Sequence, residues 1–151
     1  MTWAYSQTSG VIRHNMIDVG SGYSGFGEGK NNPAMEAVEN YGPIPQGRYL
    51  IGKAYDHPHL GPCVMNLTPT KGTTAFGRTD FRIHGDNLSH DASHGCIILN
   101  HDIREMLNNV AGGHDLQRLD EFVVRRLVVV PSRQLVALET DLAAEESVPR
   151  G

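Results

Sequence analysis

The sequence predicts a single, mainly β domain that carries one or two short helices. Its 151 residues are within the usual size of one domain and are enough to bury a core. The 17 glycines and 8 prolines fall between short apolar or alternating stretches, as expected when turns join strands. No internal repeat is apparent, so we expect one domain over residues 1–145, followed by a tail, 146–151, whose ending resembles part of a protease-cleavable tag.

The first half of the chain predicts a long loop followed by two strands. Residues 20–47 are rich in Gly, Asn and Pro and show no clear periodicity. A long ordered loop inside a compact domain is more often functional than accidental. In residues 48–55 and 63–68, large side chains recur at every second position, which is the period of a β-strand.

Residues 79–84 predict the strand that matters most for function. With a period of two, Phe81 and Ile83 share one face of this strand, and Arg82 and His84 share the other. If Phe81 and Ile83 face the core, His84 points away from it. An imidazole is therefore expected at the end of a strand, outside the apolar interior.

A helix and two late strands complete the prediction. Helical spacing i, i+3, i+4, i+7 is present at Ile103, Met106, Leu107 and Val110. Asn100 can cap the start of this helix, and Gly112-Gly113 can end it. Residues 122–130 and 134–139 look like strands joined by a turn at Pro131-Ser132, although Leu116, Leu119 and Val123 would also suit a helical face.

Composition excludes several classes of function. The formal net charge is -4 and no long run of basic residues occurs, which argues against nucleic acid as the main partner. No apolar stretch approaches the roughly 18 to 20 residues of a membrane span, and the N-terminus lacks the pattern of a secretory signal. We therefore expect no membrane insertion. Two cysteines cannot form a disulfide-rich scaffold.

Cys96 is the best candidate for a reactive group. It lies in Ser93-His94-Gly95-Cys96, where glycine allows a ligand to approach the backbone and the surroundings are polar. Cys63, among apolar neighbours, reads as a buried small side chain. The base for Cys96 is either His84, which reaches it through the fold, or His94, two positions away on the same side of an extended segment.

Two other chemistries fit the same region less well. His57, His59, His84, His90, His94 and Cys96 are possible zinc ligands, but no HExxH helix or paired CxxC motif is present. His57-Pro58-His59 is better explained as a surface turn. Ser93 is not inside a GxSxG elbow, so we expect it to hydrogen-bond the loop backbone instead of acting as a nucleophile.

Together these residues resemble a known family. Ile83-His84-Gly85-Asp86 and Ser93-His94-Gly95-Cys96-Ile97 resemble the HG…SxGC[IV] signature of YkuD-type L,D-transpeptidase catalytic domains. The sequence is more specifically similar to one branch of this group, the type VI secretion L,D-transpeptidase effectors. This similarity extends over about residues 3–130. The segments that carry it are WAYSQ (3–7), GYSG (22–25), NNP (31–33), GPIPQGRY (42–49) and the stretch from Gly77-Arg78 to Gly85. Only 12 positions separate His84 from Cys96, which is short for YkuD domains and points to the effector branch.

The resemblance implies a β-sandwich or barrel-like fold and a peptidoglycan enzyme without metal or cofactor. Cys96 would attack the carbonyl of the L-centre of meso-diaminopimelate in a tetrapeptide stem and expel D-Ala, leaving a thioester. A histidine would move the proton, and main-chain N–H groups near Gly95 and Cys96 would hold the oxyanion. Water as acceptor gives L,D-carboxypeptidase activity, a D-amino acid gives exchange, and a second stem amine gives a cross-link.

Several residues are expected to contact the substrate. Many YkuD domains carry an arginine shortly after the Cys-Ile pair, where this chain has Ile98, Leu99 and Asn100. Arg78 or Arg82 could bind the substrate carboxylate instead, because arginine binds carboxylates in bidentate fashion. The remaining expected contacts are Tyr23, Ser24, Asn31, Asn32, Asp86 and Ser93. Asp86 either orients His84 or turns the chain.

The resemblance also implies partners and a place of action. A type VI effector would be made without a signal peptide, delivered by the secretion machinery to the periplasm of a target bacterium, and neutralised by a cognate immunity protein. A peptidoglycan-binding module without catalysis and a zinc hydrolase are the alternatives. Loss of activity on removal of Cys96 would separate the enzyme from the first, and metal analysis would separate it from the second.

Overall fold

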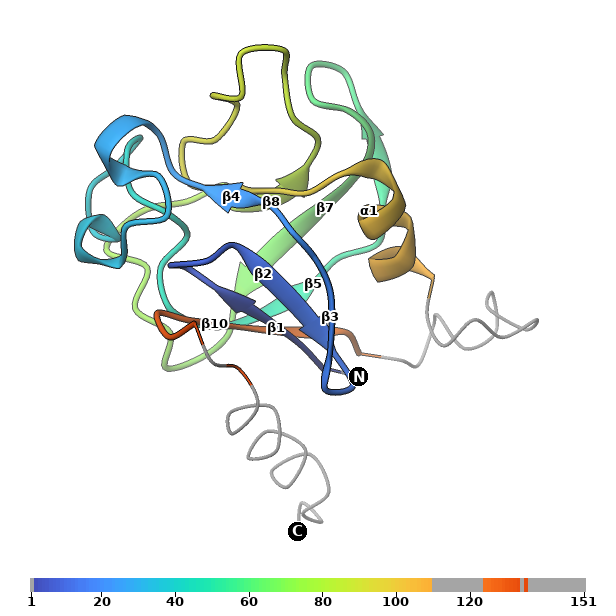
Figure 1. The fold of residues 1–151 in the computed structure, drawn as a ribbon, viewed down its shortest axis with the longest axis horizontal. Coiled ribbons are helices and arrows are strands. Elements are labelled where there is room, and N and C mark those ends of the chain that lie inside the picture. Colours follow the sequence, from blue (N-terminus) through green and yellow to red (C-terminus); the bar gives the residue numbers. More distant parts are fainter. Residues whose placement is uncertain (1, 110–123, 134, 136–151) are drawn as a thin grey trace, which may run out of the picture.

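The computed structural model describes residues 2–109, 124–133 and 135 (Figure 1). Within them, short strands dominate, with one α-helix and two 3-10 helices. The elements are β1 (Thr2–Ser6), β2 (Val11–His14), β3 (Ile17–Ser21), β4 (Tyr23–Ser24), η1 (Gly27–Gly29), η2 (Pro33–Met35), β5 (Gly47–Ile51), β6 (Tyr55–His57), β7 (Gly61–Pro69), β8 (Arg82–His84), β9 (Ile97–Ile98), α1 (His101–Asn108) and β10 (Arg126–Val130).

The strands form one mixed sheet that curls into a nearly closed, barrel-like shape (Figure 1). Its order is β3-β2-β1-β10-β5-β7-β8-β9-β4, with β6 paired to β7 off this path. The pairs β1–β10 and β8–β9 are parallel, and the other pairs are antiparallel. The prediction of a mainly β, sandwich or barrel-like domain with one or two short helices is confirmed.

Gly22 joins the two ends of the sheet. It is the single residue between β3 and β4, which are the two outermost strands of the path. Its N–H donates to the carbonyl of Gly10 at 2.9 Å. A Cβ atom at this position would lie only 1.7 Å from the carbonyl oxygen of Ile98. The sheet can therefore curl this tightly only because residue 22 has no side chain.

The interior of the curled sheet is the hydrophobic core. Aromatic rings from β1 and β5 and aliphatic side chains from most strands fill it, and α1 covers one side by packing on β7. The buried core residues are Trp3, Tyr5, Ile12, Ile44, Tyr49, Ile51, Met65, Leu67, Phe81, Ile83, Ile97, Leu99, Ile103, Leu107, Leu127 and Val129. No helix among the described residues has the length and apolar character of a membrane span.

Several predicted elements are confirmed, with different bounds. β10 lies within its predicted region, β7 extends beyond the predicted residues 63–68 at both ends, and β5 starts one residue before the predicted 48–55 and ends at Ile51. The Asn100 side chain caps α1 by accepting from the N–H of Ile103 at 2.9 Å. The helix ends at Asn108 with Asn109 as its cap, whereas the glycines 112–113 lie outside the described residues. Of the predicted strand 134–139, only Leu135 is described.

Two parts of the prediction were wrong. The strand expected over residues 79–84 is regular only at Arg82–His84, because Asp80 takes a left-handed conformation with φ 63°. The long loop predicted over residues 20–47 contains the end of β3, β4 and both 3-10 helices, and the prediction lacked the four strands before residue 25, since each has only two to five residues. These short strands complete the curl of the sheet and bring β4 beside β9.

Two loops rise on the same side of the sheet and frame the region of interest (Figure 1). One is the turn between β6 and β7, which contains His57-Pro58-His59, as the sequence predicted for this stretch. The other is the long connection between β8 and β9, which ends in the Ser93–Cys96 turn. The parallel register pairs Ile83 with Ile97, so Cys96, just before β9, lies beside Arg82, and His84 is two positions further along β8.

Candidate active site

A cavity of about 300 Å³ opens over the Cys96 thiol. Residues from β8, from the Ser93–Cys96 turn and from the loop around residue 40 form its wall. The lining residues are Glu39, Asn40, Leu60, Arg78, Thr79, Asp80, Phe81, Arg82, His84, Ala92, His94, Gly95 and Cys96. The cavity thus brings together the predicted nucleophile, both candidate bases and both candidate arginines.

The sulfur of Cys96 lies against the backbone of residues 80–82. Its S–H donates to the carbonyl of Asp80 at 3.6 Å, and the main-chain N–H of Arg82 points at the sulfur. Burial raises the pKa of the Cys96 thiol, while the Arg82 N–H and the charges of Arg82 and Arg78 oppose that rise. Since the net pKa is raised, the group is a thiol at neutral pH and needs a base to become a nucleophile.

His84 is nearly fully buried, with 3% of its surface exposed, and it lines the same cavity as the thiol. Its Nδ1 lies 2.9 Å from the carbonyl of Gly85. A carbonyl only accepts, so Nδ1 carries the proton and Nε2 is left with its lone pair. Burial lowers the pKa of His84, and the charges of Arg104 and Arg82 lower it further against the opposing effect of the Gly85 carbonyl. The ring is therefore neutral at pH 7.

His94 is held differently, although it lines the same cavity. Its ring is exposed and stacks on Phe26 with centroids 5.2 Å apart. Its Nδ1 lies 3.0 Å from the carbonyl of Asn40, so this ring also keeps a lone pair on Nε2. His94 thus forms part of a wall that links the 26–40 region to the cysteine turn. Both imidazoles have the tautomer of a base, and they differ in burial.

The turn that carries Cys96 is fixed by Ser93 and Gly95. The fully buried Ser93 hydroxyl accepts from the N–H groups of Gly25 and Gly95 at 2.8 and 3.2 Å, and it donates to the carbonyl of Cys96 at 2.6 Å. These contacts agree with the backbone role expected for Ser93. Gly95 has φ 133°, and a Cβ there would lie 2.4 Å from a guanidinium nitrogen of Arg78. Glycine at 95 is thus required by backbone angle and by space.

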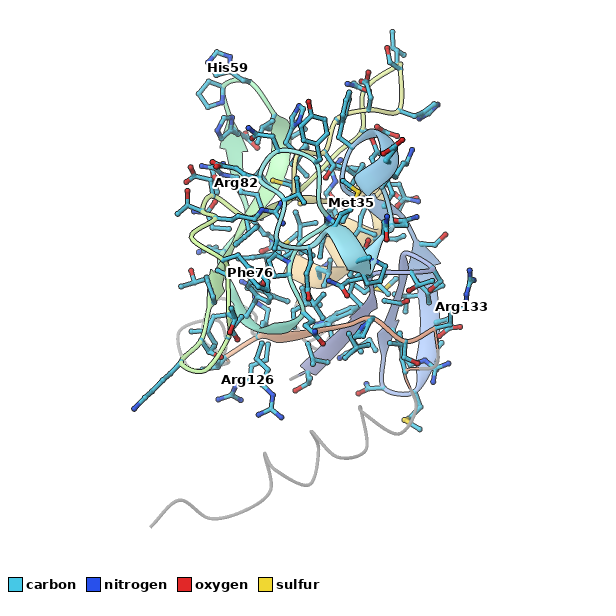
Figure 2. The ribbon with its side chains drawn as sticks, turned by 90° about the vertical axis from the view of Figure 1, so that its left-hand side faces the viewer. Met35, His59, Phe76, Arg82, Arg126 and Arg133 are labelled. Carbon is cyan, nitrogen blue, oxygen red and sulfur yellow. The ribbon has the colours of Figure 1, made fainter. Side chains whose placement is uncertain are left out.

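The two arginines of the cavity have different surroundings. Arg78 is buried, and its guanidinium donates to four backbone carbonyls, those of Glu36, Gly42, Pro43 and His94. It ties the 36–43 loop to the cysteine turn. Arg82 is 27% exposed, and within the described part of the chain its guanidinium makes only longer contacts, at 3.3 Å to the Tyr55 hydroxyl and 3.9 Å to Asp80. Arg82 is therefore the arginine that can turn towards a ligand (Figure 2).

The other expected contact residues hold the loops in place. Asp86 accepts from the Tyr23 hydroxyl at 2.5 Å and from the N–H of Asn87, and it pairs with His90 at 2.7 Å. Burial tends to raise the pKa of Asp86, but the hydrogen bonds from His90, Tyr23 and Asn87 outweigh it and lower the pKa. Asp86 therefore fastens the 86–92 loop and does not contact His84 through these bonds. The Tyr23 hydroxyl also accepts from the N–H of Ala92 at 2.9 Å.

Ser24 and Asn31 likewise bond to protein backbone. The Ser24 hydroxyl accepts from the N–H of Ile44 at 2.8 Å, and the Asn31 side chain accepts from the N–H of Ser24 at 3.2 Å. Asn32 caps η2 by accepting from the N–H of Ala34. These bonds give the glycine-rich 20–47 region a structural role around the site, and direct contact of these residues with a substrate stays a prediction.

A comparison with models of protein families completes the description of the site. Residues 19–119, about two thirds of the 151-residue chain, match the Tlde1 domain. The chain belongs to the Tlde1 family. This family consists of type VI secretion L,D-transpeptidase effectors, so the resemblance seen in the motifs is confirmed at the level of the family. Comparisons with curated proteins and with solved structures gave no match.

The Tlde1 match includes every residue that lines the thiol cavity, from Glu39 to Cys96. Membership in a family of L,D-transpeptidase-type enzymes agrees with a cysteine at the centre of the site. Within residues 2–109, 124–133 and 135, no three His, Cys, Asp or Glu side chains come close enough to share a metal ion. His84, His90 and His94 instead each have a different hydrogen-bond partner, Gly85, Asp86 and Asn40 respectively.

A second cavity of the Tlde1 domain, about 490 Å³, adjoins the first. It shares Leu60, His84, Ala92 and His94 with the thiol cavity, and its other lining residues are Phe26, His59, Gly85, Asp86, Asn87 and Asp91. Sequence reasoning missed His59 and Asp91. Neither follows a motif or a period, and the fold alone brings their two loops together.

Proposed function

We propose that this Tlde1 protein is an antibacterial effector that cleaves D-Ala from peptidoglycan tetrapeptide stems through a thioester on Cys96. The observation that carries this proposal is the cavity in which Cys96 and the buried, neutral His84 lie together. A protonated thiol beside an imidazole with a free Nε2 is the arrangement that general-base activation of a cysteine requires.

In the first step, His84 Nε2 takes the proton of the Cys96 thiol as the sulfur attacks the carbonyl of the third stem residue. The C–S bond forms, and the carbonyl oxygen becomes an oxyanion. The N–H of Gly95 already donates to Ser93 Oγ, so we assign the oxyanion to the N–H of Cys96 itself. His84 then returns the proton to the nitrogen of D-Ala, the C–N bond breaks, and D-Ala leaves.

Arg82 is the side chain we assign to the terminal carboxylate of D-Ala. A guanidinium can bind both carboxylate oxygens, which fixes the leaving residue in the thiol cavity. The guanidinium of Arg78 is occupied by backbone carbonyls, whereas Arg82 is partly exposed and loosely paired. Arg82 thus takes the place of the arginine that many YkuD domains carry after the cysteine.

In the second step, an acceptor attacks the thioester, and its proton passes to His84 and then to the leaving thiolate. Water releases a tripeptide and regenerates the thiol, which is L,D-carboxypeptidase activity. A D-amino acid amine gives a new amide bond and thus exchange. Both reactions share the acyl-enzyme, so their ratio depends on which acceptor reaches it.

Product analysis tests the proposal. Incubation with disaccharide tetrapeptide should release tripeptide and D-Ala, and added D-amino acid should yield the exchanged stem. Cys96→Ala should abolish both products. Cys63→Ala is the matched control, because Cys63 lies outside both cavities on β7, and it should keep full activity. Full turnover by Cys96→Ala, or none by the wild type, would contradict the proposal.

The biological part of the proposal needs a test in cells. The type VI secretion machinery would deliver the protein, and an immunity protein would protect the producer. Directed to the periplasm of a target bacterium, the wild type should arrest growth and Cys96→Ala should not. A peptidoglycan-binding module without catalysis would act equally with either residue at 96.

A further inference from the structure

Helix α1 carries a buried arginine that the proposed mechanism does not use. Arg104 is 6% exposed, and its guanidinium donates to main-chain carbonyls. Its Nε donates to Leu99 at 3.0 Å, and its Nη1 donates to Pro62 at 2.6 Å and to Cys63 at 3.2 Å. No carboxylate within the described part of the chain forms an ion pair with it. The protein therefore keeps a positive charge in its interior with carbonyl dipoles in place of a counter-ion.

The carbonyls that Arg104 binds lie on both sides of the strand that ends in His84. β8 is placed between β7 and β9 in the sheet. Pro62 and Cys63 belong to the start of β7, and Leu99 directly follows β9. The N–H of Leu99 in turn donates to the His84 carbonyl at 3.1 Å. One guanidinium thus ties together the two neighbours of β8 at the level of the imidazole.

Gly85 lets Arg104 approach the residue next to His84. A Cβ atom at position 85 would lie 2.8 Å from Nη2 of Arg104. Gly85 is not among the glycines with positive φ, so the backbone angle does not require glycine there. The missing side chain instead leaves room for the guanidinium. Since the Gly85 carbonyl fixes the proton on His84 Nδ1, Arg104 lies against the turn that sets the tautomer of the base.

The charge of Arg104 acts on the same imidazole. Burial is the main cause that lowers the pKa of His84, and among the charges that lower it further Arg104 has the largest effect, followed by Arg82 and His57. Burial lowers the pKa of Arg104 as well, but a guanidinium stays charged at neutral pH. The other titratable side chains that share a cavity with His84 are Glu39, His59, Arg78, Asp80, Asp86, Asp91, His94 and Cys96. Arg104 lines neither cavity, so it acts on His84 from within the protein.

We propose that Arg104 is a positioning residue for the base: it clamps the His84–Gly85 turn and keeps a positive charge close to the imidazole. This inference rests on the proposed function, in which His84 moves the proton. The clamp holds the ring in place, and the charge keeps the ring free of a proton until the Cys96 thiol supplies one. The same charge destabilises the imidazolium that then forms, which favours transfer of its proton to the nitrogen of D-Ala.

The test uses the full chain with three substitutions. Arg104→Gln removes the charge, whereas Arg104→Lys keeps the charge and loses the planar fork that spans the carbonyls. Arg125→Gln is the matched control, because Arg125 is also buried, donates to the carbonyls of Leu107, Asn108 and Gly52, and lines neither cavity. The kcat and KM for D-Ala release are measured between about pH 5 and pH 8, the range in which histidine titrates. An NMR titration of the His84 ring is recorded in parallel and needs no turnover.

The two Arg104 variants should have different effects. Arg104→Gln should raise the pKa of His84, because protonation is easier without the nearby positive charge. The ratio of kcat/KM at about pH 5.5 to that at pH 8 should then fall about three- to tenfold further than in the wild type. Arg104→Lys should keep the wild-type titration but lower kcat by about 10- to 100-fold, with little change in KM. Arg125→Gln should change neither the titration nor the pH profile, even where it lowers stability.

Two results would overturn the assignment of Arg104: a His84 titration that is the same in Arg104→Gln and the wild type, or a wild-type kcat in Arg104→Lys. Arg104→Lys retains the charge and three donors, so it decides the question also where Arg104→Gln does not fold. A shift of equal size in Arg125→Gln would likewise overturn the assignment, because the effect would then follow from lost stability. Absence of D-Ala release by the wild type would overturn the proposed function, and the NMR titration would still decide whether Arg104 controls the protonation of His84.

Discussion

His84 illustrates how one hydrogen bond can define the role of a residue. The carbonyl of Gly85 fixes the proton on Nδ1. The main chain of His84 is held as well, because the N–H of Leu99 donates to the His84 carbonyl at 3.1 Å. Burial then keeps the ring neutral. His94 has the same tautomer, but its exposed ring stacks on Phe26 and has no comparable support from the sheet.

Separate replacement of the two histidines distinguishes them. His84→Ala should lower kcat/KM for D-Ala release by about 10²- to 10⁴-fold, the usual contribution of a general base. His94→Ala should lower it by less than about tenfold, because the ring would be lost only from the wall of the site. Wild-type activity should rise with pH through a pKa below about 6.5, since His84 must be neutral to act. The opposite order of the two variants would assign the base to His94.

The sequence predicted these residues better than their contacts. The period of two placed Phe81 and Ile83 in the core, as observed, and put His84 outside the apolar cluster. It did not predict that His84 would be buried, because the covering loops come from distant parts of the chain. Asp91 was not predicted to line a cavity for the same reason.

At the level of structural elements, the Ser93–Cys96 turn and the 36–43 loop act as one unit. Arg78 joins them through four carbonyls, and its guanidinium lies against Gly95. Burial lowers the pKa of Arg78, yet the guanidinium is fully supplied with acceptors. Motif reading identified the glycine and the arginine separately. Their packing against each other depends on backbone carbonyls, which leave no signature in side-chain types.

Gly95→Ala tests how strictly the turn depends on glycine. The added Cβ meets both an unfavourable φ and the Arg78 guanidinium, so we expect a loss of about 2–3 kcal/mol in the free energy of unfolding and loss of activity. Gly72→Ala is the matched control, because Gly72 has φ 94° with open space around it and should lose only about 1 kcal/mol. Urea denaturation of both variants provides the comparison, and equal losses would exclude the steric contact as a cause.

Arg78→Lys tests the link between the loop and the turn. An ammonium cannot reach four carbonyls in a plane, so the variant should lose about 2 kcal/mol of stability and become more sensitive to proteolysis in the 36–43 loop. Arg133→Lys, at an exposed position on another part of the surface (Figure 2), should change stability by less than about 0.5 kcal/mol. If Arg78 binds substrate instead, Arg78→Lys should raise KM with stability unchanged.

For the whole molecule, closure of the sheet explains why so short a chain can present a precise site. β3 and β4 end the sheet at its two sides, and Gly22 lets one continue into the other against the backbone of β9. β4 then carries Tyr23 and Ser24 to the loops around Cys96. The N-terminal strands were missed by periodicity because they are too short to show it, yet they connect the core to the site.

The same burial that makes His84 a neutral base should make the stability of the whole molecule depend on pH. Its pKa is lower in the folded protein, so below about 6.5 the unfolded chain binds a proton that the folded one does not, and stability falls as pH decreases. The lowered pKa of Asp86 acts in the same direction, but only below about pH 4. His84→Asn keeps a donor for the Gly85 carbonyl and removes the titration. Urea unfolding at pH 8 and pH 5 should therefore show a smaller difference for His84→Asn than for the wild type. An unchanged difference in His84→Asn would mean that other groups control the acid sensitivity of the fold.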